Sequence, residues 1–440
     1  MSSDYKNYLH VNSYLSAGQK YKIFLLIFLF LLFPFFRFFT DFYFLIPVND
    51  PLLPWSIFNF IALMGCATAL VLHRKEYSER VLISFAVAFL IVIFNYFFAE
   101  MAQLKSAMNW VGFLIMFLVI AQVMKSFSEP EMIMLQVRSM QMVKFLLIVL
   151  TILTIYALLI EPWYLGPRLY YYVFEDRNQI HNLYRYHIGG NKQHFAILAT
   201  ILITFVVTHW KYLSAGIKTV FIIFILFNIP AIVGVRTMIL GAIVASLAFF
   251  FLKNRIRLVF AILIALMVIL LVIQYSNELF LIIELSYDRL PALRVSVDAM
   301  TQNIFGLGNG AYTIYVLENN DMLLATFGSE LMERHGHFWR APESDIVYFI
   351  ASFGVFSIVF FAFLGYLIVK GIHLVYHNDS IYPVERALVI HSLIMIFYGI
   401  SSDYAGKLTW WIFISLLFGI ILRNCYKPGK KKIKNNVKSV

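Results

Sequence analysis

The chain has 440 residues, of which 61% are hydrophobic and 13% are charged, and it carries a formal net charge of +11. Because a soluble domain carries about 25% charged residues, a fold surrounded by water is excluded and the lipid bilayer is the expected solvent. The basic excess lies in short segments beside apolar runs, a pattern that orients membrane proteins, so we expect no nucleic-acid partner. The two cysteines, Cys66 and Cys425, are too few for a disulfide framework.

Apolar runs of the length needed to cross a bilayer, about 20 residues, recur along the chain. They predict an all-α polytopic membrane protein of about twelve transmembrane helices, in a single transmembrane domain over residues 1–440. The mostly polar sequence before the first run predicts no signal peptide. The two runs on either side of Arg236 also fit one bent hairpin of short helices. The expected spans are 23–40, 55–73, 81–99, 108–125, 144–161, 194–210, 217–234, 237–252, 257–275, 344–369, 387–402 and 408–423.

Lysines and arginines fall mainly in alternate connections between these runs, as the positive-inside rule requires. This asymmetry predicts an even number of spans with both termini in the cytoplasm. The basic stretch 424–440 is then a cytoplasmic tail at an anionic leaflet. Two long segments, 162–193 and 276–343, are expected on the outer side, the second of them between the ninth and tenth helices. We expect them to form a cap over an active site.

Three arginines are candidates for binding an anion. Arg236 lies within the apolar stretch IPAIVGVRTMILGAIVA, where an unpaired arginine costs at least about 2.5–3.5 kcal/mol. We interpret it as a group at the outer mouth of the bundle; the alternative is an anchor that reaches the lipid headgroups. Arg289 and Arg294 follow in the outer segment, and pairing with nearby acidic residues is their alternative. A guanidinium donates two parallel hydrogen bonds to phosphate oxygens, so these residues predict a diphosphate site without a metal.

The run GLGNG places glycines at alternate positions, Gly306, Gly308 and Gly310. No βαβ unit surrounds it, so it is not a dinucleotide fingerprint. It fits a plain turn, and it also fits a backbone that approaches a sugar or phosphate closely. The aromatic residues Tyr312 and Trp339 are candidates for stacking on sugar rings, although an interface belt explains most aromatic residues of the outer segments.

The end of the outer segment, RHGHFWRAPESD, holds the remaining candidates. His335 and His337 are two positions apart and lack a further ligand at metal-site spacing, so we expect no metal. Arg340 is a further candidate for the diphosphate. Glu343 precedes the next span, where a partly desolvated carboxylate can take a proton from an attacking hydroxyl. The alternative is that Glu343 has no catalytic role and lies there because a helix N-terminus favours negative charge.

These motifs, in this order, resemble the bacterial O-antigen ligase and O-antigen polymerase (Wzy) superfamily. The resemblance rests on Arg236 at a GVRT-like helix start, on Arg289, and on the G-x-G-x-G run. It also rests on a polar residue, Glu343, that precedes Gly354 by eleven positions. The expected span count with one large late outer loop is similar as well. The motifs cover about 230–360, and topology alone covers the rest of the chain.

The resemblance implies a metal-independent, inverting glycosyltransferase with a GT-C-like fold and no cofactor. Its donor would be an undecaprenyl-diphosphate-linked oligosaccharide, used on the outer face of the bacterial inner (cytoplasmic) membrane. Arg236 and Arg289 would bind the diphosphate. In ligases a His-Asn pair precedes this helix, and Glu343 stands here instead. This departure favours a polymerase and leaves the base open between Glu343, His335 and His337.

The expected function is therefore repeat-unit polymerisation in O-antigen, capsule or exopolysaccharide biosynthesis. A growing glycan would pass from undecaprenyl diphosphate to a lipid-linked repeat unit, with membrane lipid, a chain-length regulator and a flippase as partners. The alternatives are an O-antigen ligase of the same family and a transporter or flippase for lipid-linked glycan. A transporter usually shows repeat symmetry and charges in several spans, and neither is visible here. A non-catalytic scaffold is a further alternative, but it gives Arg236 no purpose.

Overall fold

The computed structural model describes residues 15–40, 57–72, 78–99, 101–160, 192–234, 289–309, 311–328, 344–377, 381–401 and 408–425. Over these ranges the chain forms helices and turns, with no strand, so the expected all-α class is confirmed for this part of the chain. The chain is a helical membrane protein. Among the described residues, the helical stretches long and apolar enough to cross a membrane are Ala17–Phe36, Glu79–Phe98, Ser106–Lys125, Glu129–Tyr156 and Asp345–Tyr376.

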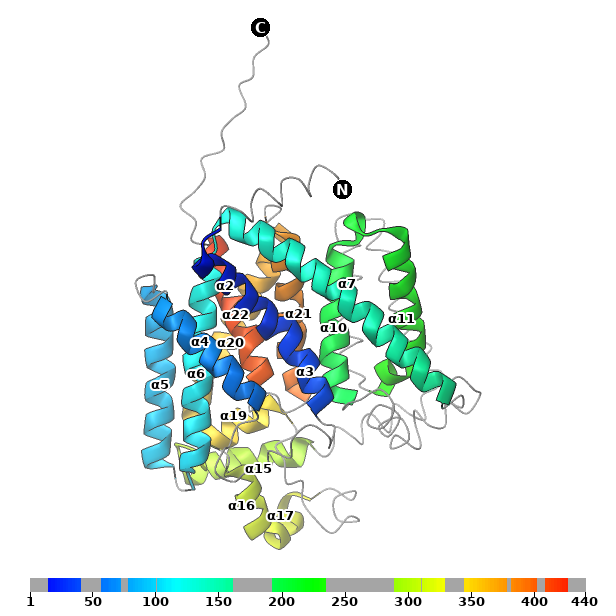
Figure 1. The fold of residues 1–440 in the computed structure, drawn as a ribbon. Helices are drawn as coiled ribbons and strands as arrows, with labels where there is room; N and C mark the ends of the chain where they lie inside the picture. Colours follow the sequence, from blue (N-terminus) through cyan, green and yellow to red (C-terminus); the bar gives the residue numbers. More distant parts are fainter. Residues whose placement is uncertain are drawn as a thin grey trace.

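The long helices run back and forth through a bundle (Figure 1). The first of them contains a π-helical turn, η1 (Phe28–Leu32), between α2 and α3. The bounds are α2 (Ala17–Ile27), α3 (Phe33–Thr40), α4 (Ile57–Leu72), α5 (Glu79–Phe98), α6 (Leu104–Lys125), α7 (Glu129–Ile160), α10 (Lys192–Thr208), α11 (Ala215–Gly234), α20 (Ser357–His377), α21 (Pro383–Ser401) and α22 (Leu408–Cys425).

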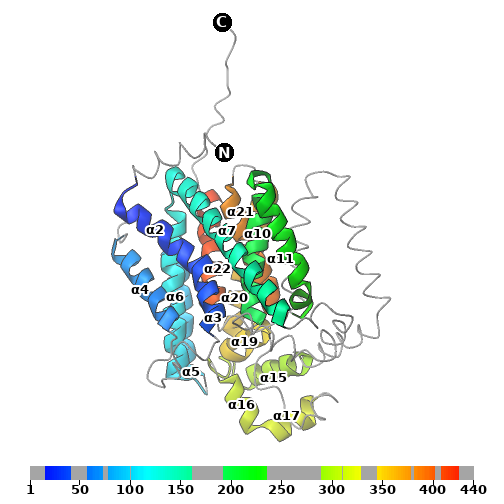
Figure 2. The same cartoon turned by 45° about the vertical axis from the view of Figure 1, so that its right-hand side comes forward.

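The bundle has two different ends, and both views show them (Figures 1 and 2). At the end here called the terminal end, α2 begins and α22 ends. The opposite end, here called the α15 end, carries shorter helices that continue the bundle as a separate layer. These are α15 (Arg289–Gln302), α16 (Tyr312–Glu318), α17 (Asn320–Phe327) and α19 (Asp345–Phe353). The predicted outer segment 276–343 therefore contains α15, α16 and α17.

Each expected span that falls on described residues coincides with helix, but two of these spans differ from the prediction in their extent or continuity. α7 begins at Glu129 rather than at 144, because Glu131 accepts hydrogen bonds from the backbone and hydroxyl of Ser128 at 2.7 and 2.6 Å and so caps an earlier start. Its 32 residues extend about 48 Å, longer than the hydrocarbon core of about 30 Å. The expected span 344–369 breaks at Gly354 into α19, the 3₁₀ turn η5 (Gly354–Phe356) and α20. The expected spans 237–252 and 257–275 lie outside the described residues.

The centre of the bundle is α22, whose described side chains are nearly all buried. It packs closely on α6, because Gly419 leaves no room for a side chain: a Cβ there would lie 2.6 Å from the carbonyl oxygen of Ala121. Trp411 meets Trp110 of α6 with ring centroids 5.0 Å apart. By contrast, α5 exposes large apolar side chains such as Phe94 and Phe97, as expected for a helix that faces lipid.

Two basic side chains at the terminal end, Arg423 and Lys22, are buried and have polar partners. Arg423 is 5% exposed and Glu385 is fully buried, and Arg423 Nη1 donates a hydrogen bond to Glu385 Oε1. Arg423 Nε also donates to the carbonyl oxygen of Phe127 at 3.0 Å, which ties α22 to the turn between α6 and α7. Lys22 donates to Ser126 Oγ at 3.1 Å. Since buried charges are tolerated only when paired, this cluster fixes how the helices meet at this end.

Candidate functional site

The glycine-rich turn lies at the α15 end, between the end of α19 and the turn that follows α5. Gly306 and Gly308 have φ angles of +79° and +105°, which favour glycine. The amide of Leu307 donates to the carbonyl oxygen of Ala351 at 2.8 Å, and the amide of Met101 donates to the carbonyl oxygen of Leu307 at 2.9 Å. The turn is therefore held on both sides by backbone hydrogen bonds.

Both glycines are needed for the packing of the chain on itself. A Cβ at Gly306 would lie 2.6 Å from the amide nitrogen of Gly354, and one at Gly308 would lie 2.6 Å from Cα of Ala102. The sequence fitted either a plain turn or a backbone that approaches a sugar or phosphate. The turn alone accounts for Gly306 and Gly308. Contact of Gly306 and Gly308 with a glycan stays a prediction, and Gly310 lies outside the described residues.

Asn95 connects this turn to two helices. It belongs to α5 and is 1% exposed. Its Nδ2 donates hydrogen bonds to the carbonyl oxygens of Phe305, at 2.9 Å, and Ser352, at 2.7 Å. Its Oδ1 accepts a hydrogen bond from the amide of Asn309 at 3.2 Å. One buried amide therefore satisfies three backbone groups that would otherwise lack partners in an apolar environment.

A chain of hydrogen bonds continues from Asn309. Trp110 Nε1 can only donate, and it donates to the hydroxyl oxygen of Tyr348 at 2.9 Å. The Tyr348 hydroxyl then donates to Asn309 Oδ1 at 2.6 Å. Asn309 Nδ2 donates to the carbonyl oxygen of Ser106 at 3.1 Å. The fixed direction of these bonds holds α6, the glycine turn and α19 together.

The sequence interpretation missed Asn95, Asn309, Tyr348 and Trp110. One signal was present for Asn95, because a lone amide in the apolar run LIVIFNYFF requires partners inside the membrane. Asn309 stands inside the glycine-rich motif that was recognised, but its side chain was not considered. The polar atoms of these residues hydrogen-bond to other parts of the chain, so we assign the residues a structural role.

The start of α19 carries the carboxylate closest in sequence to the predicted base. Ser344 caps the helix, and its Oγ accepts a hydrogen bond from the amide of Val347 at 3.2 Å. Asp345, the first residue of the helix, is 5% exposed. Its carboxylate lies against Gly399 of α21, where a Cβ would be 1.8 Å from Asp345 Oδ2. Glu343 immediately precedes this capped start and lies outside the described residues.

The arginines on α15 do not share one face. Ala292, Val295 and Ala299 form the buried face of this helix, and Arg294 is exposed. Arg289 is the first residue of the helix, and its side chain lies outside the described part. Five residues in a helix correspond to a rotation of about 140° between Arg289 and Arg294. Joint binding of one diphosphate therefore requires the two long side chains to turn toward each other.

The structure brings the glycine turn, Tyr312, α15 and the start of α19 into one region. Tyr312 begins α16 and is 3% exposed within an apolar cluster with Ala311 and Val316, so its ring presents no open face. Its contact with glycan stays a prediction. The other predicted site residues lie outside the described part of the chain: Arg236, His335, His337, Trp339, Arg340 and Glu343.

No group of three or more His, Cys, Asp or Glu side chains with metal-site geometry occurs among the described residues. Comparisons with known proteins add no family to this picture: the chain matches no protein-family model and no curated protein sequence.

Proposed function

We propose that this protein is a membrane polymerase of lipid-linked glycan repeat units. The observation that carries the proposal is the start of α19. A capped helix N-terminus with a buried carboxylate, Asp345, begins α19, which lies between the long helices of the bundle and the short helices α15 to α17 (Figure 1). The motifs in the sequence, from Arg236 to Glu343, supply the rest of the argument.

The proposed reaction is a single displacement with inversion at the sugar. Glu343 takes the proton of the acceptor hydroxyl, and the hydroxyl oxygen forms a bond to the anomeric carbon of the donor. The bond from that carbon to the diphosphate oxygen breaks, and undecaprenyl diphosphate leaves with the bonding electron pair. Because the diphosphate gains charge as this bond breaks, fixed arginines stabilise the transition state more than the ground state.

Each proposed group has a separate role. Arg236 and Arg289 bind the diphosphate, and Arg294 and Arg340 are further candidates for it. His335 and His337 are alternative bases to Glu343. Asp345 is a positioning residue, because its contact with Gly399 fixes the first turn of α19 and hence the chain directly before it.

The test is turnover by the purified full-length protein in detergent, with a synthetic undecaprenyl-diphosphate repeat unit and EDTA. We expect a ladder of lipid-linked products. Arg236→Ala and Arg289→Ala should each lower the rate at least about a hundredfold, the usual loss when a transition-state charge partner is removed. Lys211→Ala, an exposed residue at the terminal end, should leave the ladder unchanged.

Other outcomes identify other functions. Transfer only after addition of a lipid-core acceptor would indicate a ligase. Full-length polymer from well-inserted Arg236→Ala and Arg289→Ala variants would refute the proposed mechanism. The absence of any product, with folded protein and the correct repeat unit, would favour transport of lipid-linked glycan.

A further inference from the structure

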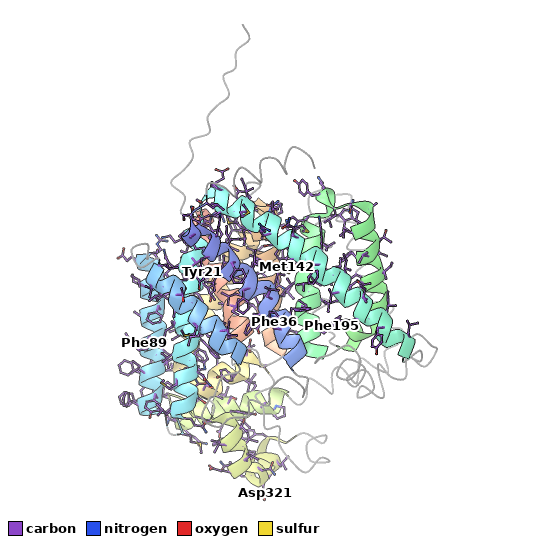
Figure 3. All side chains as sticks on the ribbon, viewed as in Figure 1. Tyr21, Phe36, Phe89, Met142, Phe195 and Asp321 are labelled. Atoms are coloured by element: carbon purple, nitrogen blue, oxygen red, sulfur yellow. The ribbon has the colours of Figure 1, made fainter. Side chains whose placement is uncertain are left out.

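A groove lies between α2 and α7, near the terminal end and away from the candidate site. Its volume is about 610 Å³, within the range of about 300–1,000 Å³ typical of ligand sites. The two helices lie side by side in both views and diverge away from the terminal end, and Met142 lies between them in Figure 3. The lining residues are Lys20, Ile23, Phe24, Ile27, Leu32, Met134, Arg138, Gln141, Met142 and Phe145.

The polar lining residues of the groove include two cations. Lys20 on α2 and Arg138 on α7 are both exposed. Within the described part of the chain, the ammonium group of Lys20 forms no ion pair. Arg138 Nη1 lies 3.5 Å from Gln141 Oε1, so the guanidinium and the amide point into the same space. None of the lining residues that the structure describes is acidic, so this part of the groove favours an anion.

The rest of the groove is apolar, and the π-helical turn extends its wall. Lys20, Ile23 and Ile27 follow one another at helical spacing on one face of α2. The next lining residue, Leu32, comes five positions after Ile27, which is the spacing of a π-helix and matches η1. An uninterrupted α-helix would place Phe30 or Leu31 there, and both are buried in the core.

We propose that this groove binds an anionic phospholipid of the surrounding membrane. The phosphate lies between Lys20 and Arg138, and one acyl chain follows Ile27 and Leu32. The rise from Lys20 to Leu32 is about 18 Å, close to the depth of about 15 Å of one leaflet's hydrocarbon. Phe24 and Phe145, which are 61% and 58% exposed, flank the chain with large apolar surfaces.

A bilayer supplies this ligand at high local concentration, and the groove separates a cationic part from an apolar part as a phospholipid requires. A zwitterionic lipid has no net negative charge, so the two cations should bind it more weakly than an anionic lipid. The inference concerns the bundle alone and does not depend on the glycan reaction.

The experiment measures binding of phosphatidylglycerol and phosphatidylcholine to the purified full-length protein by native mass spectrometry. We compare wild type with Lys20→Gln/Arg138→Gln. The matched control is Arg80→Gln/Lys211→Gln, which removes the same charge from two other exposed cations of the chain. A basic residue near an anionic lipid contributes about fivefold in affinity, so the groove variant should bind phosphatidylglycerol about 30-fold more weakly.

We expect wild type and the control to prefer phosphatidylglycerol, and the groove variant to lose this preference. Equal binding of the two lipids by wild type would overturn the proposal, as would an equal loss in the control variant. Tighter binding of undecaprenyl phosphate than of phosphatidylglycerol, abolished by the same two substitutions, would assign the groove to a polyprenyl lipid instead. A Phe24→Ser variant tests the acyl wall separately: it should weaken phosphatidylglycerol while keeping the preference over phosphatidylcholine.

Discussion

The side-chain amide of Asn95 on α5 donates a 2.7 Å hydrogen bond to the carbonyl oxygen of Ser352, two residues before the break between α19 and α20. The last turn of a helix leaves its carbonyl groups without partners inside the helix. In an apolar bundle water does not satisfy them, so partners from other parts of the chain are required. Asn95 thus makes the break in the helix possible.

Asn95→Leu should lower the free energy of unfolding by about 1–3 kcal/mol for each buried backbone group that loses its partner. The groups are the carbonyl oxygens of Phe305 and Ser352 and the amide of Asn309. The measurement is the thermal unfolding temperature in detergent. Phe94→Leu, at a neighbouring lipid-facing position, is the control and should have little effect. An unchanged unfolding temperature for Asn95→Leu would contradict this role.

Gly354→Ala should destabilise the protein by at least about 2 kcal/mol. Gly354 has a φ angle of +53°, and a Cβ there would lie 2.3 Å from the carbonyl oxygen of Ile304. Gly365 on α20 has no atom within 4 Å of its Cβ position. Gly365→Ala should therefore stabilise α20 by about 0.5–1 kcal/mol. If Gly354→Ala left the unfolding temperature unchanged or raised it, the proposed contact at Gly354 would be wrong.

The length and spacing of apolar runs predicted the helices well, because the bilayer requires a continuous helix wherever an apolar segment crosses it. The first bound of α7 was missed because the sequence from Glu129 to Lys144 contains charged residues and does not look like a membrane span. It is helical nevertheless, since the cap at Ser128 and the pairing of Lys22 near Glu131 stabilise that start.

The break at Gly354 could not be predicted from local sequence. Its φ angle of +53° depends on contact with the glycine turn, and the amide of Val355 donates to the carbonyl oxygen of Ile304 at 2.9 Å. Likewise, Asn95 and Phe305 are 210 positions apart. Sequence spacing identified Gly306 and Gly308 as special residues, but which backbone they approach is decided by tertiary packing. The number of spans and the GT-C-like fold stay predictions.

The buried pair at the terminal end should be strongly coupled. Arg423→Gln and Glu385→Gln should each lower the free energy of unfolding by about 3–5 kcal/mol, because either change leaves one charge buried without its partner. Glu385 Oε1 also accepts a 3.0 Å hydrogen bond from Asn424 Nδ2, which persists when Arg423 is replaced. The double variant removes both charges, so its loss should be smaller than the two single losses together. Additive losses in this double-mutant cycle would show that the pair contributes no coupling.

Stability should fall in acid because of His209, which follows α10. Burial lowers the pKa of His209 from 6.5 to about 4, and the nearby charge of Lys144 acts in the same direction against a hydrogen bond to Phe205. The unfolded chain therefore binds more protons than the folded chain between pH 6.5 and about 4. This stabilisation is complete above pH 6.5 and is lost as the pH falls toward 4. The contribution of His209 to the free energy of unfolding is about 3 kcal/mol, because each pKa unit corresponds to about 1.36 kcal/mol.

The check is the unfolding temperature of wild type and His209→Gln between about pH 7.5 and 4.5. Subtraction of the two profiles isolates His209 from other titrating groups. Below about pH 6.5 we expect the unfolding temperature of the wild type to fall more steeply with decreasing pH than that of the variant. Parallel profiles would contradict the lowered pKa.

Gly399→Ala tests whether the buried carboxylate positions the start of α19. The added methyl group would lie 1.8 Å from Asp345 Oδ2, so the carboxylate and the first turn of the helix must move. We expect a lower unfolding temperature and at least about a tenfold slower polymer ladder, since displacement of about 1 Å near a reacting group costs up to about a hundredfold.

Removal of the Asp345 carboxylate then distinguishes the steric effect of the new methyl group from the positioning role of the carboxylate. In Gly399→Ala/Asp345→Ala the new methyl group takes the space of the missing carboxylate, so the unfolding temperature should recover. Polymerisation should stay slow, because the carboxylate that positions the first turn of α19 is then absent. A Glu343→Gln variant should be inactive with a wild-type unfolding temperature, as expected for a base rather than a positioning residue. Full activity of Asp345→Ala alone would remove Asp345 from the site and leave the base to be sought among Glu343, His335 and His337.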